Sequence, residues 1–225
     1  MAKDDSKHEV AVAEPNQLEA VATSLVSKLV DFGIDGLGPL SAASEVADKA
    51  LRDAGGDVEE AVDDIVRSHG RVAAIGGFAT GVAGFTTMLV SVPANLVEFY
   101  VVATRMTAAI AHLRGYDVSD DRIRTAVLLS LVGSNSADIL AKAGVSVGTG
   151  AALNVAGRSL PKSALMVIQK AVGFRILRSV GERVFARVGK LVPVVGGLFG
   201  AGVDLAMMKR IADQARAEFP RTLGA

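Results

Sequence analysis

One serine in the chain has the spacing of a nucleophilic catalyst. Residues 144–148 read Gly-Val-Ser-Val-Gly, which matches the G-x-S-x-G elbow of serine hydrolases and places Ser146 as the nucleophile. That elbow requires a strained strand-to-helix turn, and no strand pattern precedes this segment. The candidate partners, His112 and Asp138, both come before Ser146, whereas these hydrolases run in the order serine, acid, histidine. We interpret the match as a chance occurrence in a segment rich in glycine and serine, and keep a lipid-acting serine hydrolase as the alternative function.

Other kinds of site find little support in the sequence. The chain has no cysteine, which excludes a disulfide scaffold, a thiolate zinc site and cysteine catalysis. Neither a Walker loop nor the spacings of a zinc protease or an EF-hand occur. An acidic cluster, Glu59, Glu60, Asp63 and Asp64, is expected to be the solvated face of a helix. We therefore expect no catalytic residue, no metal site and no cofactor, and a protein that is more readily a binding protein than an enzyme.

A basic segment is the strongest candidate for a binding surface. Residues 158–190 carry 8 basic residues and 1 acidic residue. At about 100° per residue, an apolar arc runs from Leu177 to Leu191. Five basic residues lie outside the arc and are the predicted lipid-binding residues: Arg175, Arg178, Arg183, Arg187 and Lys190. Basic amphipathic helices of this type lie on anionic lipid.

A second interpretation of the basic segment stays open. Residues 1–70 carry 6 basic and 15 acidic residues, although the whole chain has 24 of each sign and a net charge of zero. The basic helix could therefore pack its apolar arc on the core and pair its cations with this acidic part. The zero net charge also argues against a nucleic-acid partner bound by bulk charge.

The apolar composition predicts an all-α fold. Hydrophobic residues make up 50% of the 225 residues, aromatic residues only 4%, and there are 24 glycines, with a mean hydropathy of +0.39. Helical spacing and caps predict a single helical domain with closely packed, glycine-rich central helices. The expected helices cover residues 17–30, 44–54, 58–70, 93–113, a segment capped by Ser119, 159–191 as one helix or two, and 193–218.

The segment from Val72 to Val97 carries no charge and is long enough to span a bilayer. Its glycines and Pro93 favour a buried helix that ends near residue 90 and a new helix that begins at the proline. Gly77 and Gly81 are spaced for close helix contact, and we expect Gly81 at such a contact.

Two glycine-rich stretches carry a family resemblance. The chain resembles the EcsC protein family over roughly residues 45–220. The resemblance is carried by residues 77–85, followed by Val92-Pro93 and Arg114-Gly115-Tyr116-Asp117, and by residues 192–204. The chain departs from the family pattern at Ser91, where an acidic residue is usual, and at Asp204, where asparagine is frequent. The resemblance implies a bacterial protein that associates with membranes rather than one that catalyses a reaction.

These observations predict the organisation and location of the protein. We expect a disordered N-terminal tail over residues 1–15, an EcsC-like helical domain over 16–220 and a C-terminal tail over 221–225. The N-terminus is charged and has no apolar run behind it, so it is not a secretion signal. We expect a cytoplasmic protein at the inner face of the membrane, which binds an anionic membrane surface or a membrane protein. The sequence leaves a homo-oligomer open.

Overall fold

The computed structural model describes residues 15–75, 94–145, 155, 157, 158, 160–188 and 196–222. All regular elements of these residues are helices, which confirms the predicted all-α fold. In chain order they are α1 (Pro15–Lys28), the π-helix η1 (Leu29–Asp35), α2 (Ala43–Asp53), α3 (Val58–Ile75), α4 (Ala94–Leu113), α5 (Asp121–Ser130), the 3₁₀ turn η3 (Gly133–Asn135), α6 (Ser136–Lys142), α8 (Lys162–Val188) and α9 (Gly196–Glu218).

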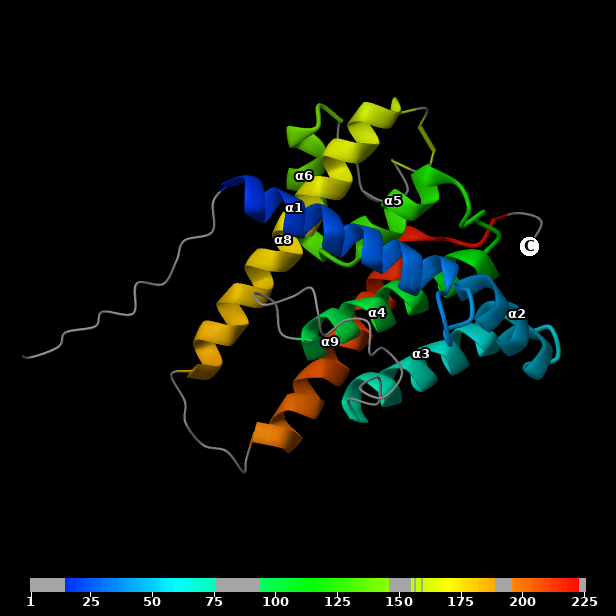
Figure 1. Cartoon of the computed structure of the whole chain (residues 1–225). Helices are drawn as coiled ribbons and strands as arrows, with labels where there is room; N and C mark the ends of the chain where they lie inside the picture. The colour runs from blue at the N-terminus through cyan, green and yellow to red at the C-terminus, as the bar shows by residue number, and fades with distance from the viewer. Residues whose placement is uncertain are drawn as a thin grey trace, which may run out of the picture.

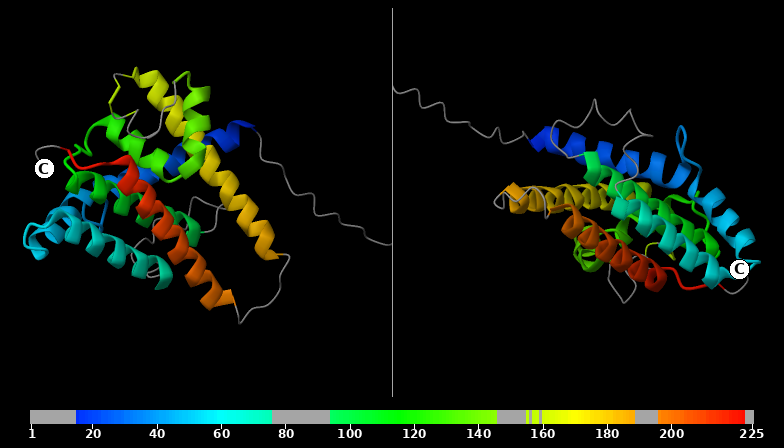
Figure 2. Two further views of the ribbon diagram at one scale, coloured as in Figure 1. Left: turned by 180° about the vertical axis from the view of Figure 1, so that it is seen from behind. Right: turned by 90° about the horizontal axis from the view of Figure 1, so that it is seen from below.

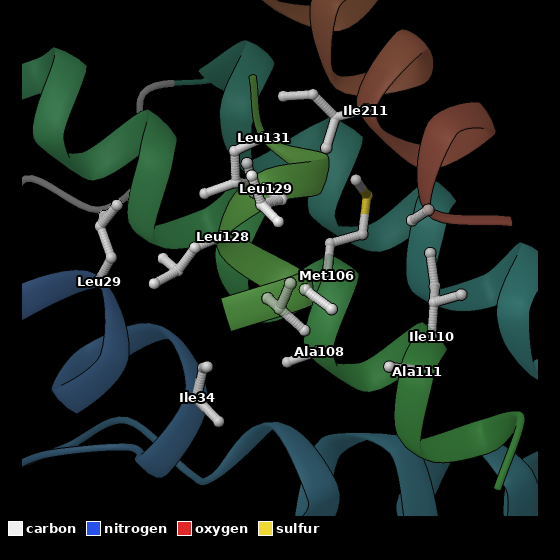
Figure 3. Close-up of a cluster of buried hydrophobic side chains, with 14 of the residues drawn as sticks. Leu29, Ile34, Met106, Ala108, Ile110, Ala111, Leu128, Leu129, Leu131 and Ile211 are labelled. Atoms are coloured by element: carbon white, nitrogen blue, oxygen red, sulfur yellow. The ribbon is translucent and has the colours of Figure 1, made fainter. Parts of the chain in front are cut away.

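Helix α4 forms the centre of the molecule. From Val97 to Leu113 every side chain but those of Glu98 and His112 is buried, as expected for a helix that is apolar nearly all round. It contacts α2, α3, α5, α9 and η1. Figure 3 shows Met106 and Ile110 of α4 within a cluster that also draws residues from η1, α5 and α9. The surrounding elements are therefore held together through one central helix.

The remaining helices pack around α4 in pairs. Helix α1 lies against α8, and α3 lies against both α4 and α9. Seen from below, α1 and α9 lie at opposite edges of the molecule with α3 and α4 between them (Figure 2). The C-terminal part of α8 and the N-terminal part of α9 extend away from the other helices (Figure 1).

Two glycines allow this close packing. A Cβ atom on Gly173 of α8 would lie 2.5 Å from the carbonyl oxygen of Ala22 in α1. A Cβ atom on Gly33 of η1 would lie 2.7 Å from Cβ of Thr104 in α4. Both distances are too short for a side chain, so the backbones meet there only because the residue is glycine. Gly77 and Gly81, where we expected such contacts, lie outside the described residues.

Two expected helix boundaries are wrong. Gly70 was expected to end the third helix, but α3 continues to Ile75. Gly70 instead faces α9, where an added Cβ would lie 3.1 Å from Cδ1 of Leu205. Glycine is kept there for packing and not for a left-handed turn.

The cap of α5 is the second correction. Asp120 and not Ser119 caps this helix, because its backbone is extended and its carboxylate accepts a 2.8 Å hydrogen bond from the backbone N–H of Arg122. The hydroxyl of Ser119 donates to Asp117 instead, at 2.6 Å. A cap one residue later starts the helix at Asp121.

Other boundaries agree with the sequence. The helices expected at 44–54, 93–113 and 193–218 correspond to α2, α4 and α9, and the segment 159–191 holds one continuous helix, α8. The carboxylate of Asp57 caps α3, accepting from the backbone N–H groups of Glu59 and Glu60 at 2.9 and 3.1 Å. None of the described helices is both long and apolar enough to cross a membrane.

The predicted tails fall mostly outside the described residues. Of residues 1–15, only Pro15 is described, and it begins α1. In the C-terminal tail, Thr222 donates to the backbone carbonyl of Arg114 from its N–H at 3.1 Å and from its hydroxyl at 3.0 Å. The chain is therefore anchored at least as far as Thr222.

Candidate functional site

The structure places part of the predicted lipid-binding set on the outer side of α8. Arg175 and Arg178 are exposed, and Nη2 of Arg175 donates to the side-chain oxygen of Asn135 in η3 at 2.7 Å. Arg183 and Arg187 belong to α8, but their side chains are outside the described residues, as is all of Lys190.

Apolar side chains of α8 are exposed as well. Met166 is 68% exposed, Val167 53% and Phe174 36%. The opposite side of the helix is buried in the core through Leu165, Ile168, Val172 and Ile176. We call the outer side the α8 face, defined by Lys162, Met166, Val167, Phe174, Arg175 and Arg178.

The sequence reasoning found the cations of this face and missed two of its apolar residues. The predicted apolar arc began at Leu177, which is partly buried against the core. Met166 and Val167 lie earlier in the same helix, before the predicted arc begins. A helical wheel drawn over the whole of residues 162–188 was the signal that could have shown them.

The described ion pairs of the acidic N-terminal part involve several elements of the fold. Among the ion pairs between described residues, Glu19 pairs with Lys170 of α8. The other pairs that join residues 15–70 to a distant basic residue are Asp35–Arg124, Asp48–His112, Glu59–Arg114 and Asp63–Arg216. The acidic part thus folds onto several elements, and α8 contributes one described cation to it.

A cavity of about 250 Å³ lies between the segment before α2, helix α2, helix α3 and the centre of α4. The sequence reasoning did not find it. Its wall is formed by Pro39, Leu40, Ser41, Val46, Ser68, His69, Val72, Val102 and Arg105. Five of these residues are aliphatic or proline, and the polar ones include a cation from the most buried helix of the fold. One sequence signal existed, since Arg105 is the only charged residue in the otherwise uncharged run from Phe99 to Ala111.

Arg105 carries a buried charge. It is 7% exposed, and its Nε and Nη2 atoms are buried with no hydrogen-bond partner in the described part of the chain. Burial lowers the pKa of Arg105 from its usual value, and the negative charge of exposed Glu45 opposes that shift. No carboxylate among the described residues forms an ion pair with this guanidinium.

His69 is the second polar group in the cavity wall. It is 8% exposed, and its Nδ1 lies 2.8 Å from the backbone oxygen of Ile65. A carbonyl only accepts, so Nδ1 carries the proton and Nε2 is left as an acceptor in the neutral ring. Burial, reinforced by the positive charge of Arg105, lowers the pKa of His69 to about 4. The ring is therefore neutral at physiological pH, and Arg105 is the cation of the cavity wall.

The two described residues considered for hydrolysis, His112 and Asp138, lie on different helices, α4 and α6, and no hydrogen bond or ion pair joins them. Nε2 of His112 lies 3.0 Å from a carboxylate oxygen of Asp48, while Asp138 is exposed on α6. Ser146 lies outside the described residues. In the part of the chain that the structure describes, no group of histidine and acidic side chains could hold a metal ion.

Comparison with known proteins gives one assignment. No curated protein and no solved structure matches the chain. The model of the EcsC protein family matches residues 8–223, almost the whole sequence. The chain, with its α4-centred helical fold, therefore belongs to the EcsC protein family.

Proposed function

We propose that this protein binds the surface of anionic membranes through the α8 face, without catalysis. The observation that carries the proposal is the exposure of Met166, Val167 and Phe174 on the most basic segment of the chain. Exposed apolar side chains gathered on one helix mark an interaction surface. Basic residues beside them favour a partner that is both apolar and negatively charged, and the surface of an anionic bilayer has both properties.

The expected energies suit reversible binding. Each basic residue near an anionic surface contributes about 1 kcal/mol, and the attraction decays over about 10 Å at ordinary salt. Full burial of a large apolar side chain contributes about 1.5–3 kcal/mol, so partial insertion of three exposed ones contributes roughly 3 kcal/mol. Two arginines and three apolar side chains together give about 5 kcal/mol, which is the strength of a reversible peripheral contact.

Co-sedimentation with vesicles tests the proposal. We expect the full chain to bind vesicles of phosphatidylglycerol and phosphatidylcholine, to bind less as salt is raised, and to bind pure phosphatidylcholine weakly. Replacing Arg175 and Arg178 with glutamine removes about 2 kcal/mol, a loss of about 30-fold in the partition coefficient. Phe174→Ser should weaken binding with little change in its salt dependence.

A matched variant controls for net charge. Arg52→Gln combined with Arg67→Gln removes the same charge from exposed positions on α2 and α3, and should change binding less than threefold. Absence of binding by the wild type at low salt would refute the proposal. A dimer that Phe174→Ser dissociates, without vesicle binding, would assign the α8 face to a second copy of the chain and would equally overturn it. Extending the glutamine substitutions to Arg183, Arg187 and Lys190 tests the rest of the predicted set.

A further inference from the structure

The cavity beside α4 is lined by a buried cation, Arg105, that forms no ion pair with any residue the structure describes. A buried guanidinium without a counter-ion is strongly unfavourable, because it has lost its hydration and gained no partner. Arg105 lines the cavity, and its Nε and Nη2 atoms have no hydrogen-bond partner among the described residues. A guanidinium is a planar group of five N–H donors that suits the oxygens of a carboxylate.

A second buried arginine shows how this chain satisfies a structural guanidinium. Arg114 follows α4 directly and is buried to nearly the same degree as Arg105. Its Nη2 donates to both carboxylate oxygens of Glu59 at 3.0 and 2.9 Å, and its Nη1 donates to the backbone oxygens of Arg216 and Phe219, each at 3.1 Å. Arg105 lies nine positions earlier in the sequence, and its Nε and Nη2 atoms have no hydrogen-bond acceptor of this kind among the described residues.

The cavity wall restricts what could neutralise Arg105. His69 is neutral and offers an acceptor, and the remaining side chains carry no charge. One cation suits a singly charged ligand better than a doubly charged phosphate monoester. The aliphatic part of the wall, from Leu40, Val46, Val72 and Val102, suits a short hydrocarbon chain. The volume of about 250 Å³ equals that of about eight water molecules, which suits a small organic acid.

We propose that this cavity binds a small aliphatic carboxylic acid, whose carboxylate pairs with the guanidinium of Arg105 and whose chain lies against the aliphatic wall. This site is separate from the α8 face, so it goes beyond the membrane function proposed above. Binding requires the carboxylate and the hydrocarbon chain together, because the carboxylate alone contacts only Arg105 and the chain alone contacts only the aliphatic residues of the wall.

Thermal unfolding of the full chain, without vesicles, tests the site. Hexanoate is the probe, with hexanol as the uncharged analogue and inorganic phosphate as the anion without a chain. We expect millimolar hexanoate to raise the Tm, by about 5–10 °C when its concentration reaches a hundred times Kd. Hexanol and phosphate should shift the Tm little.

Arg105→Met gives the sharper result. This variant removes the unpaired charge and keeps a flexible side chain of similar length, so the ligand-free Tm should rise while the hexanoate shift disappears. Arg124→Met is the matched control, because the guanidinium of Arg124 is already paired with Asp35. We expect it to lower the ligand-free Tm and to keep the hexanoate shift.

Direct observation completes the test. The Nε–H resonance of Arg105 in a nitrogen-15 spectrum should move downfield on addition of hexanoate in the wild type, a readout that also serves if Arg105→Met fails to fold. An unmoved Nε–H resonance, an equal hexanoate shift in Arg105→Met, or equal shifts with hexanol would each overturn the proposal. A rise in Tm with phosphate but not with hexanoate would identify the ligand as an inorganic anion, and would overturn the proposal as well. None of these outcomes depends on membrane binding by the α8 face.

Discussion

The contact between α1 and α8 depends on Gly173, and its replacement by alanine has a calculable effect. The added Cβ would lie 2.5 Å from the carbonyl oxygen of Ala22, and 3.0 Å from Cγ2 of Val26. Ordinary contact begins at 3.4 Å, so the two helices must separate by nearly an ångström. A gap of this size forfeits a quarter to a half of the dispersion energy across the contact.

The net effect follows from two opposing terms. Overpacking costs about 1–3 kcal/mol, and the upper value applies here because a backbone atom cannot rotate away. Alanine is the better helix former by about 1 kcal/mol. We therefore expect Gly173→Ala to lower the free energy of unfolding by about 2 kcal/mol, which is a fall of about 4–8 °C in Tm for a chain of this length.

Gly202 provides the matched control for this prediction. It lies exposed within α9, and an added Cβ would contact no described residue within 4 Å. Gly202→Ala should therefore gain the helix term alone and raise the Tm by about 2–4 °C. Melting curves followed by circular dichroism at 222 nm measure both variants. A Gly173→Ala chain that melts at or above the wild-type temperature would show that the α1–α8 packing is wrong.

Three further predictions concern charge and capping. As the pH falls from 6.5 toward about 4, His69 gains a proton in the unfolded chain but not in the folded chain. The free energy of unfolding should therefore fall by up to about 3 kcal/mol. Urea titrations at pH 7 and 4.5 measure this fall, and His69→Asn should make it smaller. Arg114→Ala leaves Glu59 and two backbone carbonyls without their donor. It should lower the free energy of unfolding by about 2–4 kcal/mol, and hydrogen exchange at Phe219 and Thr222 should become faster. Asp120→Ala should cost about 1 kcal/mol through the lost cap of α5, and Ser119→Ala much less, as chemical denaturation would show.

The helices were predictable because apolar spacing decides them locally. The apolar run of α4 and the Asp57 cap of α3 fix those elements within a few residues, so the sequence placed them correctly. Gly70 was misinterpreted because a glycine that ends a helix and one that admits a neighbouring helix look alike until Leu205, distant in sequence, is in place. The cavity was missed for the same reason, because its wall joins residues of α2, α3 and α4 that only the tertiary fold brings together.

The distribution of ion pairs bears on which of the two interpretations of the basic segment is the better one. If the acidic N-terminal part existed to neutralise α8, its carboxylates would gather there. In the described pairs, four of its carboxylates meet the distant basic residues Arg114, Arg124, Arg216 and His112, and Glu19 pairs with Lys170 of α8. Those pairs link α2, α3 and η1 to the C-terminal half and stabilise the arrangement around α4. In the described part of the chain these acidic residues therefore link neighbouring helices, and the vesicle experiment with the α8 variants discriminates between the two interpretations of the basic segment.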